Sequence, residues 1–397
     1  MPIPKMSDID LKGKQILIRE DFNVPLKNGE VTSDLRIRAA IPTIKQALKA
    51  GGKVMLMSHL GRPNEGVFDE TFSLAPVARE LSKLLKRDVP LIHNWIDGFN
   101  MGDASLVLLE NVRFHHGETD NNVELSKRMA ALCDVFVMDA FATSHRAESS
   151  TCGIIRFAKE TCAGPLLLSE LEALGKIMEK PAHPVVAIVG GSKVSTKLAL
   201  LDSLVKVVDH LIIGGGIANT FLAAEGYTVG KSLHEPDLID EAERLTLEAK
   251  KRNAEIPLPV DVIVADRFAE DAEAYVRLVS QVDDNEKIFD VGPDTIKLFT
   301  SIIKKAKTIL WNGPLGAFEV DEFAKGTQAI AKAVAESKAF KVAGGGDTLA
   351  AIEKYKISNK IDYISTGGGA FLTVLEGKKL PVITALEERA NKKEKVA

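Results

Sequence analysis

The stretch Val185-Val-Ala-Ile-Val-Gly190-Gly191-Ser192-Lys193 joins an uninterrupted apolar run to a pair of glycines. An apolar run without alternation is typical of a parallel strand that is buried on both faces. The same pattern of an apolar strand followed by glycines recurs three times, at Leu211–Gly216, Lys341–Gly346 and Ile364–Gly369. Because parallel strands need long, usually helical connections, this half of the chain is predicted to be built from βαβ units.

Short apolar runs alternate with helical patterns from one end of the chain to the other. Strands are predicted in the first half at Gln15–Arg19, Lys53–Ser58, Leu106–Glu110 and Val135–Asp139. In the second half they are predicted at Val185–Val189, His210–Ile213, Val260–Val264, Thr308–Trp311, Phe340–Ala343 and Tyr363–Ser365. Helices are predicted between them at segments such as Leu74–Lys86, Val123–Ala131 and Lys325–Ser337. The predicted fold class is α/β, with two doubly wound, Rossmann-like parallel-sheet domains.

The chain is too long for one ordinary hydrophobic core, since it has 397 residues. Pro165 opens a helical pattern that Pro181 and Pro184 end, and we interpret it as a helix hinge joining the two domains. The predicted domains are an N-terminal one over residues 1–170 and a C-terminal one over residues 171–380, followed by a charged tail over 381–397.

The amino-acid composition indicates to which classes of protein the chain can belong. Hydrophobic residues make up 45% and charged residues 27%, as in globular proteins, and the net charge of −4 argues against a nucleic-acid binder. No apolar run approaches the roughly 20 residues of a membrane span, and the N-terminus lacks a signal core. Cys133, Cys152 and Cys162 show no metal-binding spacing, so we expect reduced thiols and a cytoplasmic location.

In the first half, nearly every predicted strand leads directly into polar or basic residues. Ligands of an open parallel sheet bind beyond the carboxyl ends of its strands. If the strands are neighbours, one pocket could be lined by Arg36, His59, Arg62, Arg113 and Arg146. Several guanidinium groups around one cavity match carboxylate and phosphate oxygens, so the predicted ligand is small and carries several negative charges. Asp139 could be a general base, but a capping or supporting role is as plausible.

In the second half, four glycine turns follow strands of one predicted sheet. Glycines allow close backbone approach to a ligand, and helix starts offer free N–H groups, so a multi-phosphate ligand is predicted. Lys193 and Lys197, four residues apart on a predicted helix, could flank phosphate oxygens. Asp347 is a candidate Mg²⁺ ligand, and Glu319 could bind ribose hydroxyls.

Two nucleotide-binding signatures are nearly present. Glu225 stands where a phosphate loop ending in Gly230-Lys231-Ser232 would need its first glycine, and no strand precedes it. Asn219 stands where the dinucleotide fingerprint beginning at Gly214 would need its last glycine. A dinucleotide-dependent oxidoreductase therefore remains an alternative, as does a catalytically inactive binding protein of the same fold.

Six segments resemble the motifs of the phosphoglycerate kinase family, in family order and across essentially the whole chain. They are Arg19–Pro25, Ser58–Pro63, Gly190–Lys197, Trp311–Glu319, Gly344–Thr348 and Ser365–Ala370. The resemblance implies reversible, Mg²⁺-dependent transfer of a phosphoryl group from 1,3-bisphosphoglycerate to ADP, giving 3-phosphoglycerate and ATP. It also implies a monomer whose C-terminal tail packs back on the first domain.

The resemblance also implies site residues. Those that bind the glycerate substrate would be Asp21, Asn23, Arg36, His59, Arg62, Arg113 and Arg146. Those that bind the nucleotide would be Lys197, Gly214, Gly215, Asn312, Pro314, Glu319, Gly344, Gly345, Gly346, Asp347 and Thr348, with Asp347 serving the metal. The catalytic residues would be Arg36, Lys193, Gly368 and Gly369.

The acceptor in the ATP-consuming direction is a carboxylate, which is already ionised at neutral pH with a pKa of roughly 4. The reaction therefore needs no general base, and catalysis would consist of positioning and neutralisation of charge. Because the two ligands are expected on different domains, the domains would have to close around them.

Overall fold

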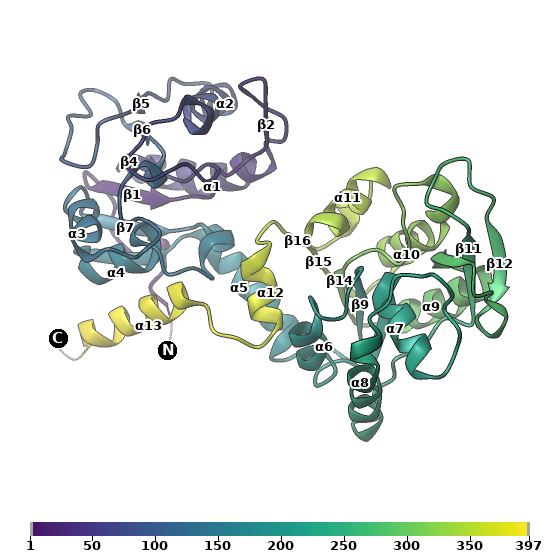
Figure 1. Cartoon of the computed structure of the whole chain (residues 1–397). Coiled ribbons are helices and arrows are strands. Elements are labelled where there is room, and N and C mark those ends of the chain that lie inside the picture. Colours follow the sequence, from purple (N-terminus) through teal and green to yellow (C-terminus); the bar gives the residue numbers. More distant parts are fainter. Residues whose placement is uncertain (1–2, 395–397) are drawn as a thin grey trace. The chain divides into compact units, whose positions relative to one another are not determined.

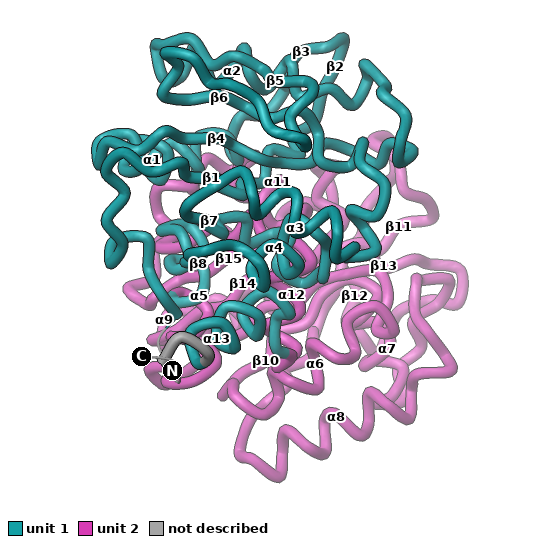
Figure 2. The backbone as a smooth tube through the Cα atoms, turned by 90° about the vertical axis from the view of Figure 1, so that its left-hand side faces the viewer, with its two compact units in different colours: residues 1–172, 379–397 teal, residues 173–378 magenta. Residues whose placement is uncertain are grey.

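The computed structural model describes residues 3–394. The chain divides into two compact units, shown in different colours in Figure 2. Unit 1 consists of residues 1–172 and 379–397, and unit 2 of residues 173–378. Strands and helices alternate along the chain through both units (Figure 1).

Unit 1 is built on a six-stranded sheet in which every pair of neighbours is parallel. Its strands, in spatial order, are β5 (Leu91–Ile92), β6 (Leu106–Leu109), β4 (Lys53–Met57), β1 (Gln15–Arg19), β7 (Val135–Met138) and β8 (Glu160–Ala163). The chain passes from one side of β1 to the other between β6 and β7. Ligands of such sheets bind at this switch point, beyond the carboxyl ends of the strands.

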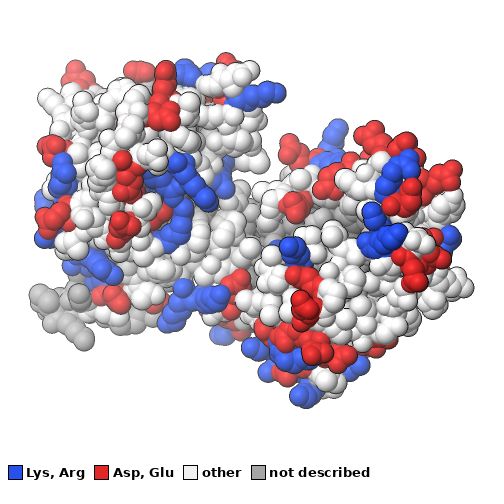
Figure 3. Space-filling model, viewed as in Figure 1, with Lys and Arg blue, Asp and Glu red and all other residues white. Residues whose placement is uncertain are grey.

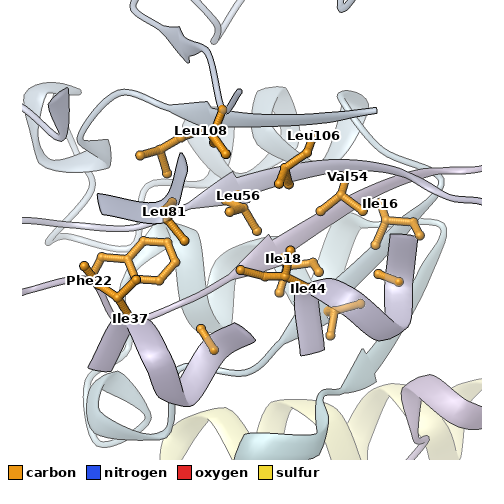
Figure 4. Packing of buried hydrophobic residues seen from close by; sticks show 14 of the residues in the cluster. Ile16, Ile18, Phe22, Ile37, Ile44, Val54, Leu56, Leu81, Leu106 and Leu108 are labelled. Atoms are coloured by element: carbon orange, nitrogen blue, oxygen red, sulfur yellow. The ribbon is translucent and has the colours of Figure 1, made fainter. Parts of the chain in front are cut away.

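One face of this sheet packs against α1 (Leu35–Lys49) and α2 (Ala75–Leu85). Figure 4 shows side chains from the strands and both helices gathered in this layer, among them Ile18, Ile44 and Leu81. The alternate strand residues, such as Leu17 and Phe136, are also fully buried. Burial on both faces explains why these strands are apolar without alternation.

The other helices of unit 1 include α3 (Val123–Ala131), α4 (Ile154–Phe157) and α13 (Pro381–Glu394), which contacts α4 and β8. Val382 and Leu386 of α13 are completely buried, and Arg389 donates a hydrogen bond of 2.8 Å to the carbonyl of Ala158. The C-terminal segment is thus part of the packed structure of unit 1. A small hairpin, β2 (Leu26–Lys27) and β3 (Glu30–Val31), follows β1.

Unit 2 contains a five-stranded parallel sheet. Its strands, in spatial order, are β10 (His210–Gly214), β9 (Val185–Gly190), β14 (Thr308–Asn312), β15 (Phe340–Gly344) and β16 (Tyr363–Ser365). Its helices are α6 (Leu198–Leu204), α7 (Gly215–Ala224), α8 (Ile239–Lys251), α9 (Pro293–Lys305), α10 (Lys325–Glu336), α11 (Gly346–Lys354) and α12 (Gly369–Leu375). The chain enters unit 2 along α5 (Pro165–Met178).

The strand predicted at Val260–Val264 exists as β11 (Asp261–Ala265), but it does not belong to the parallel sheet. It pairs antiparallel with β12 (Tyr275–Leu278) and β13 (Lys287–Val291) in a separate three-stranded sheet. The connections between these strands are short, whereas a parallel crossover needs a dozen or more residues. Spacing along the chain, which the prediction did not weigh, therefore decides the sheet to which β11 belongs.

A buried carboxyl group in this small sheet predicts a dependence of stability on pH. Asp290 is 2% exposed and accepts a hydrogen bond of 2.6 Å from the Gly326 amide at the start of α10, and burial raises its pKa to about 7. In the unfolded chain this group loses its proton near about pH 4. Between these two pH values the folded state binds more protons than the unfolded chain. The free energy of unfolding therefore falls as the pH rises through that window.

Asparagine at position 290 does not titrate. We therefore expect the melting temperature of the parent chain to fall relative to that of Asp290→Asn as the pH rises from about 4 to about 7. Thermal unfolding of both proteins across this range measures the difference. A difference that does not change with pH would contradict the assignment of the raised pKa to Asp290.

Candidate functional site

Because the strands of each large sheet are parallel, the residues that follow them lie at one edge of the sheet. In unit 1 the segments after β1, β4, β6 and β7 carry all the predicted glycerate-binding residues except Arg36, which lies in the first turn of α1. Lys and Arg side chains gather in a patch on this unit in the view of Figure 3.

The first group at this edge is organised around Arg36. Its Nη1 lies 2.9 Å from Oδ2 of Asp21 and donates a hydrogen bond of 2.8 Å to the carbonyl of Asn23. The side chain of Asn23 in turn accepts a hydrogen bond of 2.9 Å from the amide of Gly61, after β4. The loops that follow β1 and β4 are therefore tied together beside the Arg36 guanidinium.

The second group surrounds a pocket of about 570 Å³ that is lined by Arg62, Arg113, Arg146, Glu65 and Glu148, among others. Arg113 is only 6% exposed and is held by two acceptors. Its Nη1 donates to the carbonyl of Gly61 at 2.7 Å, and its Nη2 lies 3.0 Å from Oε1 of Glu148. The same oxygen lies 3.5 Å from Nη1 of Arg146, so one buried carboxylate pairs with two arginines.

His59 lies deeper and is 2% exposed. Burial is the main reason that its pKa is well below the usual value, and the charges of Arg19, Arg113, Arg146 and Arg36 lower it further. The imidazole is therefore neutral at physiological pH. The sequence predicted the position of His59 but not this state, which depends on burial.

Asp139, for which two roles were open, caps the N-terminus of α5. It accepts hydrogen bonds from the Thr43 hydroxyl at 2.5 Å and from the Leu167 amide at 3.0 Å. Burial raises its pKa to about 6, against the effect of these hydrogen bonds. Both contacts are structural, and they connect β7 to α1 and to the start of α5.

In unit 2 the centre of the arrangement is Asn312, the last residue of β14. Its Oδ1 accepts a hydrogen bond from Nζ of Lys197, and its Nδ2 donates 2.7 Å to the carbonyl of Gly344. The next amide, that of Gly313, donates 2.7 Å to the hydroxyl of Thr348 in α11. The segments after β9, β14 and β15 are thereby joined at one edge of the sheet.

The prediction that Lys193 and Lys197 lie on one face of a helix was wrong, because the helix begins later in the chain than predicted. Residues 191–197 form an irregular loop, and α6 begins only at Leu198. The amide and hydroxyl of Ser195 donate to the carboxylate of Glu235, at 2.8 and 2.6 Å. This distant acceptor holds the loop outside a helix. Lys193 is exposed, whereas Lys197 lies at the helix start and is partly buried.

The glycine turns serve two different purposes. A side chain at Gly190 would come within 1.7 Å of the carbonyl oxygen of Pro314, and one at Gly214 would meet the backbone of Leu315 at 2.5 Å. These two glycines allow protein loops to pack against each other. In contrast, a Cβ added at Gly346 or Gly368 would meet nothing within 4 Å. Both lie at helix starts and leave room for a ligand near exposed N–H groups.

The remaining predicted nucleotide-site residues lie at the same edge. Gly215 begins α7, Pro314 and the exposed Glu319 follow β14, and Gly345 precedes α11. Asp347 is exposed in the first turn of α11, and its charge acts on Lys197. Within residues 3–394 no group of three or more His, Cys, Asp or Glu side chains could hold a metal by itself.

Comparisons with known proteins agree with this geometry. A family model described as phosphoglycerate kinase matches residues 6–378. The chain belongs to the phosphoglycerate kinase family. A phosphoglycerate kinase of Nitratidesulfovibrio vulgaris is 58% identical over 392 residues, covering 99% of this chain and 100% of the relative. The family resemblance inferred from the motifs is confirmed.

Two solved phosphoglycerate kinase structures are similar over almost the entire chain. That of Coxiella burnetii is 55% identical with a TM-score of 0.94, and covers 98% of this chain and 100% of the other. That of Pyrococcus horikoshii is 32% identical with a TM-score of 0.82, covering 98% and 99%. These likenesses confirm the α/β fold with two parallel sheets.

As a phosphoglycerate kinase, the chain is an enzyme and a transferase, and the dinucleotide oxidoreductase and inactive-protein alternatives are not favoured. Among the described residues, no helix is both long enough and apolar enough to span a membrane. The motif analysis gave no role to three buried residues: Glu148, which lines the pocket, and Arg19 and Glu118, which are completely buried. The only signal for Glu148 was its place two residues after Arg146.

Proposed function

We propose that unit 1 binds 3-phosphoglycerate, that unit 2 binds the adenine nucleotide, and that phosphoryl transfer between them is reversible. The main observation in support is the pocket lined by Arg62, Arg113 and Arg146 in unit 1, with Arg36 at the same edge of the sheet. Three guanidinium groups suit a phosphate, which carries about two negative charges. Arg36, held separately by Asp21 and Asn23, suits the carboxylate at the other end of the substrate.

The nucleotide phosphates would bind at the edge of the unit 2 sheet, between Lys197 and the helix starts at Gly346 and Gly368. Mg²⁺ typically takes one or two carboxylates together with phosphate oxygens and water. The single exposed carboxylate of Asp347 beside a glycine turn fits an ion that is held mainly by the nucleotide. When bound, Mg²⁺ would neutralise charge on the phosphate oxygens.

The remaining chemistry belongs to the side chains and the backbone. Arg36 would orient the acceptor carboxylate, and Lys193 and the amides of Gly368 and Gly369 would donate to the transferring phosphoryl group. Transfer requires the acceptor and the phosphoryl group to come into line, so the two units must bring their ligands together during turnover. We also propose a monomer with a cytoplasmic location, and the buried thiols of Cys133 and Cys152 support that location.

The test of the function is an assay that couples ADP formation to a second enzyme, with ATP and Mg²⁺ present. We expect ATP consumption with 3-phosphoglycerate and essentially none with glycerate, which lacks the phosphate. Equal rates with both acceptors would reject the assignment of the three-arginine pocket. A fluorescence titration with NADH, performed without coupling enzymes, is expected to show no binding, whereas saturable binding would favour the oxidoreductase alternative.

Replacing Asp347 with asparagine should raise the Mg²⁺ concentration that gives half-maximal rate by about ten-fold or more, because a carboxylate ligand becomes a neutral amide. A Mg²⁺ titration at saturating ATP measures the change. Glu353→Gln, an exposed acid later in the same helix, is the matched control. If Asp347→Asn and Glu353→Gln require the same Mg²⁺ concentration, Asp347 does not serve the metal.

Replacing Glu148 with alanine should raise the KM for 3-phosphoglycerate by about ten-fold, because Arg113 and Arg146 lose the carboxylate that orients them. The KM for ATP should not change. Glu148→Gln keeps an acceptor for Arg113 and should be affected less. Glu65→Gln removes a charge from the same pocket without an arginine partner, and so reports the effect of charge alone. If Glu148→Ala instead lowers the KM for 3-phosphoglycerate, Glu148 does not serve to orient the arginines and only reduces the positive electrostatic potential of the pocket.

A further inference from the structure

The neutral His59 ring carries one proton, and its position decides what the ring offers to a ligand. A protonated nitrogen donates a hydrogen bond to an anion, whereas an unprotonated nitrogen repels it. The structure contains a neighbour that settles this choice. Nη2 of Arg19 lies 3.3 Å from Nδ1 of His59.

A guanidinium group has only donors and cannot accept a hydrogen bond. Nδ1 of His59 must therefore be the acceptor in this contact, which places the proton of the neutral ring on Nε2. The two ring nitrogens of histidine are distinct for this reason: the hydrogen bond made by one fixes the protonation of the other.

Arg19 is held in a single orientation. It is 0% exposed, its Nε donates 2.9 Å to the hydroxyl of Ser150, and its Nη1 donates 2.5 Å to the carbonyl of Glu20. Ser150 in turn donates its hydroxyl to Oε1 of Glu118 at 2.5 Å and its amide to Oε2 at 3.0 Å. The hydroxyl hydrogen is thus used on Glu118, which leaves its oxygen to accept from Arg19.

The charged groups with the largest effect on the pKa of His59 come from four different segments of unit 1. They are Arg19 at the end of β1, Arg36 in α1, Arg113 in the turn after β6 and Arg146 in the segment after β7. All four are cations, and each opposes protonation of the ring. A neutral ring among four cations can bind an anion only through an N–H group.

We propose that Arg19 is a positioning residue of the glycerate site, and that it holds His59 as the neutral tautomer whose Nε2–H donates to the anionic substrate. This inference rests on the proposed function, because it takes 3-phosphoglycerate as the ligand of unit 1. Its consequence is that His59 recognises the substrate in the same way across physiological pH, although an ordinary histidine titrates in this range.

The tautomer can be observed directly in the complete, unmodified chain. Long-range ¹⁵N–¹H correlation spectra of protein labelled at histidine distinguish both neutral tautomers and the imidazolium ion. The His59 signals are assigned by their absence from His59→Gln. We expect the Nε2–H pattern, unchanged between about pH 6 and about pH 8. An Nδ1–H pattern or an imidazolium pattern at neutral pH would overturn the proposal.

Two substitutions of His59 then test which nitrogen matters. The amide of glutamine reaches the position of Nε2, and that of asparagine reaches only the position of Nδ1. We expect the KM for 3-phosphoglycerate to be about 10- to 100-fold higher in His59→Asn than in His59→Gln, with the KM for ATP alike in both. Equal KM values for 3-phosphoglycerate would overturn the role of Nε2–H.

The role of Arg19 itself is tested with Arg19→Gln, compared with Arg79→Gln, an exposed arginine whose guanidinium contacts the carbonyl of Gly29. In Arg19→Gln the His59 signals should shift toward a mixture of tautomers or become pH-dependent, because one cation is lost and the shorter amide that replaces the guanidinium group can accept as well as donate a hydrogen bond. Ser150→Ala, which removes the acceptor of Arg19 Nε together with the hydroxyl donor to Glu118, is a second variant if Arg19→Gln does not fold. Unchanged His59 spectra in the variant that folds would refute the role of Arg19.

The spectra need no substrate, so their outcome is independent of the assay. A chain that is inactive with 3-phosphoglycerate but shows the Nε2–H pattern would contradict the proposed function alone. An active chain with the Nδ1–H pattern would contradict only this inference.

Discussion

Replacing Arg36 with alanine is expected to lower turnover of 3-phosphoglycerate by about 10³-fold while ATP still binds. Arg36 pairs with Asp21 and Asn23 at the carboxyl end of β1, in unit 1, whereas all proposed nucleotide contacts lie in unit 2. The substitution removes the charged donor that we propose for the acceptor carboxylate. It also leaves Asp21 without this cation, which adds repulsion toward an anionic substrate.

The matched control is Arg38→Ala. Arg38 lies two residues further along α1, but it points to an exposed ion pair with Asp34 at 2.7 Å. Exposed pairs of this kind contribute about 1 kcal/mol or less, so this variant should keep its activity. Steady-state kinetics measure turnover, and calorimetric titration measures ATP affinity. Normal turnover by Arg36→Ala, or equal losses in both variants, would exclude the proposed role.

The second large effect is expected for Lys197→Ala, in which the KM for ATP should rise by about 100-fold and kcat should also fall. Burial lowers the pKa of Lys197, and the nearby Asp347 carboxylate acts in the opposite direction. The ammonium group is fixed by Asn312 at the end of β14. A cation that is partly removed from water, and already positioned, interacts more strongly with phosphate oxygens than a solvated one.

Lys206→Ala is the control for this substitution, since Lys206 is exposed just after α6. Asn312→Ala adds a second measurement, because it leaves Lys197 in place but removes its acceptor. We expect an intermediate rise in the KM for ATP. If Lys197→Ala behaves like Lys206→Ala, the nucleotide phosphates bind elsewhere in unit 2.

The sequence predicted the strands of the two large sheets well where they are buried on both faces. The run Val185–Gly190 is such a case, because its short, uninterrupted apolar stretch followed by glycine is typical of a central parallel strand, and all six of its residues are buried. Several strands were not predicted, among them β8 and β12. Glu160–Ala163 contains polar residues at a sheet edge, and Tyr275–Leu278 is largely exposed, so neither has the apolar pattern on which the prediction depended.

In the candidate site, too, some residues could be predicted from the sequence and others could not. Residues such as His59 and Arg113 could be predicted because they closely follow strands whose carboxyl ends meet at one edge of the sheet. Their partners could not, because each comes from a distant segment. Glu148 orients Arg113, which lies 35 residues earlier, and Glu235 keeps Ser195 out of a helix from 40 positions away. Such contacts depend on how the elements pack, which local patterns do not specify.

The return of α13 to unit 1 has a consequence for biosynthesis. A ribosome makes residues 173–378 before it makes α13, whose Val382 and Leu386 fill the core beside β8 and α4. Translation of unit 2 is thus complete before the last helix of unit 1 is made. A released chain that ends at position 378 would contain all of unit 2 but would lack the helix that covers part of unit 1, and would therefore expose an apolar surface of the kind that chaperones bind.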